Sequence, residues 1–82
     1  MEAKITIFST PTCPYCNMAK DFLKENGISY TDFNVKEDAN ARKEMLAKSG
    51  QLGVPVIIVK KEAKETIIIG FDREKIESVL EI

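Results

Sequence analysis

The sequence contains no histidine, and cysteine occurs only twice among its 82 residues. Without histidine the chain has no imidazole base, no Cys–His dyad and no histidine ligand for a metal ion. A structural zinc site uses a full tetrahedral set of nitrogen or sulfur ligands, and two cysteines cannot complete it. We therefore expect no metal site and no chemistry that depends on an imidazole.

An excess of positive charge is also missing. Charged residues make up 30% of the chain, but the formal net charge is −1, and lysines stand beside acids at residues 36–38 and 60–62. A nucleic-acid surface needs clustered lysine and arginine, so we expect no nucleic-acid partner. No apolar run could span a bilayer, and residues 1–4 lack the basic and apolar parts of a secretory signal. We expect a cytoplasmic protein without a membrane partner.

The two cysteines that are present form the segment Cys13-Pro14-Tyr15-Cys16, between an apolar run and a helical pattern. Thiols at i and i+3 on the first turn of a helix can close into a small disulfide ring. The helix N-terminus offers free N–H groups and partial positive charge that stabilise a thiolate. In a βαβ context such a pair indicates a redox motif. The alternative is a structural disulfide or a pair of inert thiols, but a bridge across so short a loop adds little stability.

The remaining pattern predicts one small α/β domain, residues 1–82, that stays monomeric. We expect strands at residues 4–8, 28–35, 56–59 and 66–69, with residues 60–65 joining the last two. The apolar runs at residues 56–59 and 67–69 should lie in the core, the first on a strand covered on both faces. Helices should run from Pro14 to a stop at Gly27, over residues 39–48 behind an Asp38 cap, and from an Asp72 cap through Ile76, Val79 and Leu80. The inward residues by helical spacing are Met18, Ala19, Phe22, Leu23, Ala41, Met45, Leu46, Ile76, Val79 and Leu80. The order βαβαββα predicts a four-stranded mixed sheet with helices on both faces.

Three segments in this order make the chain resemble the glutaredoxins: Cys13-Pro14-Tyr15-Cys16, Gly53-Val54-Pro55-Val56 and Gly70-Phe71-Asp72. The resemblance implies a thioredoxin-like fold, a loop ending in a cis-proline that faces the thiols, and a turn that opens the last helix. The chain looks most like the small bacterial glutaredoxin-like redoxins. It is also similar to the redoxins that supply electrons to ribonucleotide reductase.

The resemblance implies a dithiol–disulfide oxidoreductase that reduces protein disulfides or glutathione mixed disulfides. Cys13, at the helix entry, is the expected nucleophile and Cys16 the expected resolving thiol. Glutathione is the expected co-substrate, with no resident cofactor. One alternative is a redoxin reduced by a flavoprotein reductase of the thioredoxin type. Another is an iron–sulfur protein in which Cys13 of two chains and external glutathione thiols hold a cluster, although Pro14 disfavours it.

Two departures from the family bear on glutathione. Thr10 and Gln51 stand where glutaredoxins usually carry basic residues that attract the carboxylates of glutathione. Their loss weakens the case for tight glutathione binding and favours the reductase-coupled alternative. The expected substrate-binding residues are Thr10, Thr12, Pro14, Tyr15, Gln51, Val54, Pro55, Gly70, Phe71 and Asp72.

Several of these residues have a structural reading beside the functional one. Tyr15 could face substrate or only pack on the helix start. Val54-Pro55 could merely begin a strand, or could present the Val54 backbone to an extended peptide or to glutathione. Asp72 could act only as a helix cap, or Gly70 to Asp72 could also receive the γ-glutamyl carboxylate. No inward acid–base partner for Cys16 is evident.

Overall fold

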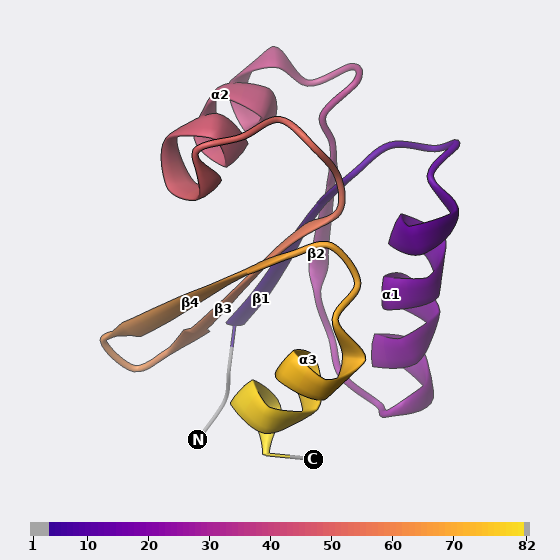
Figure 1. Cartoon of the computed structure of the whole chain (residues 1–82), viewed down its shortest axis with the longest axis vertical. Coiled ribbons are helices and arrows are strands. Elements are labelled where there is room, and N and C mark those ends of the chain that lie inside the picture. The colour runs from indigo at the N-terminus through magenta and orange to yellow at the C-terminus, as the bar shows by residue number, and fades with distance from the viewer. Residues whose placement is uncertain (1–3, 82) are drawn as a thin grey trace.

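The computed structural model describes residues 4–81 and has three helices around one sheet (Figure 1). The elements are β1 (Lys4–Ser9), α1 (Pro14–Glu25), β2 (Thr31–Asn34), α2 (Ala39–Ser49), β3 (Val56–Lys61), β4 (Lys64–Ile69) and α3 (Arg73–Leu80). The sheet order is β2-β1-β3-β4, with β1 and β2 parallel and the other pairs antiparallel. This is the predicted mixed sheet. The expectations for residues 1–3 and for the chain end at residue 82 lie outside the described residues.

Both faces of the sheet are covered because side chains alternate across the central strands β1 and β3. On one face Ile5 and Ile7 of β1 pack with Ile57 and Val59 of β3, beneath α1 and α3. On the other face Phe8, Val56 and Ile58 pack beneath α2. Figure 1 shows α2 on one side of the sheet, and α1 and α3 on the other. Burial on both faces explains the unbroken apolar run in β3.

Aspartate residues cap the second and third helices as predicted. Asp38 and Asp72 cap α2 and α3 by accepting the N–H groups of Ala41 and Lys75. Gly50 ends α2 in the left-handed region, at φ 75°, where a residue without Cβ is favoured. The ends of the elements therefore follow from local chemistry.

Some expected boundaries are wrong. The second strand begins at Thr31 instead of residue 28, because the Ile28 N–H caps α1 by donating to the Leu23 carbonyl. The last two strands extend to Lys61 and Lys64, so only Glu62 and Ala63 connect them, with Glu62 at φ 53°. Backbone pairing continues past the apolar residues that marked these strands in the sequence.

Three residues expected in the core lie on the surface. Met18 is 47% exposed and Leu46 is 46% exposed, because it is their neighbours Ala19 and Met45, both fully buried, that face the sheet. Successive residues on a helix point about 100° apart, so two adjacent apolar residues do not always both reach the core, although Phe22 and Leu23 of α1 do. Ile69 is also exposed, at the end of the edge strand β4.

Within residues 4–81, none of the helices has the length and apolar character needed to cross a membrane.

Candidate redox site

Cys13 is the N-cap residue of α1. Its backbone is extended, with φ −92° and ψ 111°, and Pro14 takes the first helical position, where a missing N–H costs nothing. The Cys16 N–H donates to the Cys13 sulfur at 3.2 Å. A helix N-terminus carries partial positive charge, so this sulfur occupies a position that favours an anion. Cys13 is half-buried and therefore open to solvent on one side.

Cys16 lies one turn further along α1 and is fully buried. Burial, followed by the hydrogen bond with the Cys13 thiol, raises the pKa of Cys16 from its ordinary value of 9.0 to about 12. Both thiols are free in this structure. The two cysteines are therefore unequal: one is accessible at a helix terminus, and the other is inaccessible and protonated near neutral pH.

The loop before β3 reaches Cys13 from the other side. The Cys13 sulfur lies 4.0 Å from the Val54 carbonyl oxygen, and the Val54–Pro55 peptide bond is cis. Pro55 is buried, and its carbonyl accepts the N–H of Gly70 at 2.8 Å. The structure thus brings together Cys13, Val54, Pro55 and Gly70, which the sequence had placed in three separate segments.

Gln51 turns back onto its own loop. Its Oε1 accepts the Gly53 N–H at 2.7 Å, and its Nε2 donates to the Gly53 carbonyl at 2.9 Å. The side-chain amide of Gln51 is therefore engaged with backbone at the position where a basic residue was expected to meet glutathione.

The expected binding residues around Cys13 lie in the turn before α1 or on the exposed surface of its first turn. The Thr10 carbonyl accepts the Cys13 N–H at 3.3 Å, which closes the turn before α1. Thr12, Pro14 and Tyr15 are exposed, and Tyr15, 62% exposed, lies on the surface instead of packing on the helix start.

Phe71 and Asp72 contribute to the structure of the turn before α3. Phe71 is half-buried and packs edge-to-face on Phe22. Asp72 is exposed and uses Oδ1 to accept the Lys75 N–H at 3.1 Å. Both contacts are sufficient to explain these residues as parts of the fold.

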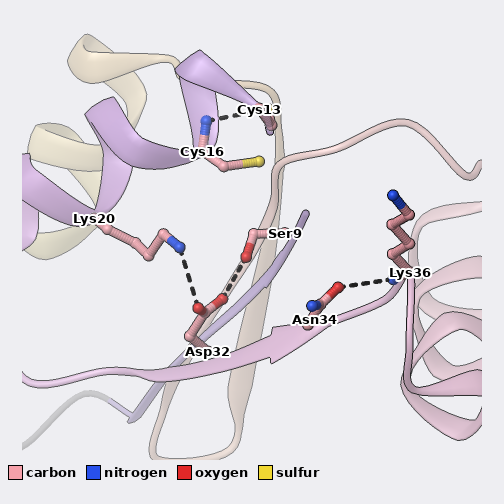
Figure 2. Close-up of polar contacts among 7 residues, drawn as sticks. All are labelled: Ser9, Cys13, Cys16, Lys20, Asp32, Asn34 and Lys36. Atoms are coloured by element: carbon pink, nitrogen blue, oxygen red, sulfur yellow. Dashed lines mark hydrogen bonds and ion pairs between the residues drawn. The ribbon is translucent and has the colours of Figure 1, made fainter. Parts of the chain in front are cut away.

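A polar network below Cys16 was missed in the sequence. Lys20, one turn after Cys16 on α1, forms an ion pair with Asp32 of β2 at 3.1 Å (Figure 2). The other Asp32 oxygen accepts the buried Ser9 hydroxyl at 2.6 Å. The Lys20 ammonium acts to lower the pKa of Cys16, but burial and the Cys13 hydrogen bond outweigh it. The spacing from Cys16 to Lys20 was visible in the sequence, whereas its pairing with Asp32 requires the β1–β2 register.

The fold and the unequal thiol pair define a small thioredoxin-like redox protein. The family model described as Glutaredoxin matches residues 5–63, and the chain belongs to the glutaredoxin family. An uncharacterized glutaredoxin-like protein of Clostridium pasteurianum, encoded in a rubredoxin operon, is 43% identical over 77 residues, covering 94% of this chain and 97% of that protein.

Two solved structures are similar over almost the whole chain. A variant of the thioredoxin-like protein BC3987 has a TM-score of 0.85 at 35% identity, covering 96% of each chain. The glutaredoxin-like NrdH-redoxin of Escherichia coli has a TM-score of 0.75 at 25% identity, covering 93% of each chain, and is described as having a thioredoxin-like activity profile. These likenesses confirm the predicted thioredoxin-like fold and support thiol–disulfide oxidoreductase chemistry in general.

Proposed function

We propose that this protein reduces disulfides through Cys13 and Cys16, with protein disulfides as its main substrates. The observation that carries the proposal is the unequal thiol pair. The half-buried Cys13 sulfur accepts a helix N–H, while Cys16 is buried behind it with a raised pKa. A nucleophile must be accessible and anionic, and a resolving thiol should stay protonated until a mixed disulfide has formed.

The proposed reaction has two exchange steps. The Cys13 thiolate attacks one sulfur of the substrate disulfide, which forms a mixed disulfide and releases the other substrate sulfur as a thiolate that takes a proton. The Cys16 sulfur then attacks the Cys13 sulfur and gives up its proton, and the second substrate sulfur leaves as a thiolate that takes a proton. The substrate gains two electrons, and the protein is left with a Cys13–Cys16 disulfide that a reductant must reopen.

A second candidate concerns that reductant. Glutathione would regenerate a typical glutaredoxin, but Thr10 carries no charge and the Gln51 amide is bonded to Gly53. These observations favour a flavoprotein reductase of the thioredoxin type as the electron donor. The thioredoxin-like activity profile of the similar Escherichia coli redoxin supports the same choice of electron donor.

A coupled assay tests both statements. Consumption of NADPH is followed while the protein reduces insulin disulfides, with either thioredoxin reductase or glutathione plus glutathione reductase as the source of electrons. We expect turnover with the thioredoxin reductase system to exceed turnover with glutathione. Activity with the glutathione system and none with thioredoxin reductase would overturn the choice of reductant. No activity in either system would overturn the proposed function.

A further inference from the structure

We propose that Gln51 is a positioning residue that sets the orientation of the Val54 N–H beside Cys13, and so makes the loop ready to pair with an extended substrate backbone. The inference rests on the proposed function, because it assigns a role in binding the disulfide substrate. It differs from the sequence expectation, in which Gln51 meets glutathione directly.

One planar peptide group links the Gln51 contact to the Val54 N–H. The Gly53 carbonyl and the Val54 N–H belong to the same planar peptide group, and the only cis bond within residues 4–81 is Val54–Pro55. In a trans peptide the carbonyl and the N–H point in opposite directions. When Gln51 Nε2 holds the Gly53 oxygen at 2.9 Å, it therefore also directs the Val54 N–H away from Gln51.

The Val54 N–H makes no hydrogen bond within the part of the chain that the structure describes. Val54 is half-buried, and its carbonyl lies 4.0 Å from the Cys13 sulfur. A free donor and a carbonyl on one residue are the groups with which an extended peptide forms strand-like pairs. The donor is thus available where a substrate disulfide would meet Cys13.

Gln51 is itself anchored to the fold. The Ser49 hydroxyl, which has one hydrogen to donate, lies 2.6 Å from the Met45 carbonyl oxygen and 3.0 Å from the Gln51 carbonyl oxygen, which ties the loop to the last turn of α2. Beyond the loop, Pro55 is buried and bonded to Gly70. Leu52 and Gly53 are exposed between these two anchors, so the Gln51 amide is the contact that holds the intervening backbone.

Gly53 supports the same role. Its φ lies outside the left-handed region, so the backbone would accept alanine. A Cβ there would lie 2.6 Å from Gln51 Oε1, the flexible end of a side chain, and would push the amide away. Gly53→Ala therefore removes the Gln51 contact without altering Gln51 itself.

The test measures how fast the protein reduces a synthetic peptide with one internal disulfide. Dithiothreitol reduces the oxidised protein after each turnover, and the rate at which dithiothreitol alone reduces the peptide is subtracted. Gln51→Met keeps the length of the side chain but loses both hydrogen bonds. Gln51→Glu keeps an acceptor for the Gly53 N–H and loses the donor to its carbonyl. Lys43→Met, an exposed substitution on α2, is the matched control.

Loss of preorganisation should weaken binding more than chemistry. We expect Gln51→Met, Gln51→Glu and Gly53→Ala each to raise KM about three- to tenfold and to leave kcat within about twofold. Adding Gly53→Ala to Gln51→Met should cause no further rise, because the clash partner is gone. Lys43→Met should leave KM unchanged. An unchanged KM in Gln51→Met, or a fall confined to kcat, overturns the inference.

Amide hydrogen exchange at Gly53, measured by NMR, supplies a readout that needs no activity. Exchange should be faster in Gln51→Met than in the parent and in Lys43→Met. If exchange is faster in Gln51→Met but the parent protein does not reduce the peptide, the role of Gln51 stands and the proposed function is overturned. If exchange is equal and the parent protein is active, the role of Gln51 alone is overturned. Should Gln51→Met fail to fold, Gly53→Ala decides between these outcomes, because Gln51→Glu keeps the acceptor for the N–H of residue 53.

Discussion

The backbone N–H of Cys16 donates to the sulfur of Cys13 at 3.2 Å, so the proposed resolving residue gives a hydrogen bond to the proposed nucleophile. The contact uses the main chain, and it therefore survives when the Cys16 side chain is replaced. This relationship separates the two cysteines in a way that mutagenesis can test.

Replacing Cys13 by serine should abolish disulfide reduction, because the buried Cys16 cannot reach a substrate in its place. Replacing Cys16 by serine should leave measurable turnover of glutathione mixed disulfides, since an external thiol can resolve the intermediate. Both variants are measured with hydroxyethyl disulfide and glutathione, after thermal unfolding has confirmed that they fold. An active Cys13→Ser together with an inactive Cys16→Ser would reverse the roles.

The stability of the reduced protein should fall in alkaline solution because of Cys16. Its pKa is raised from 9.0 to about 12 by burial and by the Cys13 hydrogen bond. The unfolded chain releases this proton from about pH 9, whereas the folded chain keeps it, so the contribution is complete below pH 9 and is lost toward pH 12. Urea unfolding under reducing conditions should show a steeper decline above about pH 9 than Cys16→Ser shows. Parallel profiles would contradict the prediction.

Thr10→Lys should improve glutathione-dependent turnover. An ammonium in the turn before Cys13 would attract a glutathione carboxylate, and an exposed charge pair contributes up to about 1 kcal/mol, or a few-fold in KM. The gain should shrink at high salt. Ser78→Lys, on the exposed side of α3, adds the same charge elsewhere and serves as the control. An equal effect of both variants, or none, would show that residue 10 does not face the carboxylate.

Asp32→Ala should destabilise the fold by ~1–3 kcal/mol, because it leaves the buried Ser9 hydroxyl without its partner. Ser9→Ala should cost less, since the Asp32 side chain is 34% exposed and remains solvated and paired with Lys20. The double variant should be more stable than Asp32→Ala alone, which chemical unfolding can measure. Asp21→Ala, exposed on α1, controls for the lost charge. If the losses of unfolding free energy in Asp32→Ala and Ser9→Ala simply add in the double variant, the two side chains are not coupled and the prediction is wrong.

Local chemistry explains why much of the fold could be predicted from the sequence. Asp38 and Asp72 mark helix starts because carboxylates satisfy free N–H groups wherever they stand. The run at residues 56–59 indicated a strand buried on both faces, and all four residues are buried. The errors at Met18 and Leu46 arose because adjacent apolar residues leave the rotation of a helix open by about one residue.

The sequence by itself determined the positions of the thiols, the helix that begins at Pro14 and the strands on either side of it, because these depend on residues close together in the chain. The family resemblance predicted a cis-proline loop facing the thiols, which the structure confirms, but only the tertiary structure decided the contacts that surround them. Val54 lies 41 positions from Cys13, and Asp32 meets Ser9 only through the β1–β2 register. The Gln51 contact with Gly53 is local, yet it depends on a side-chain rotamer that the anchored ends of the loop select. Contacts between distant segments follow from the packing of the whole sheet, so short-range patterns could not reveal them.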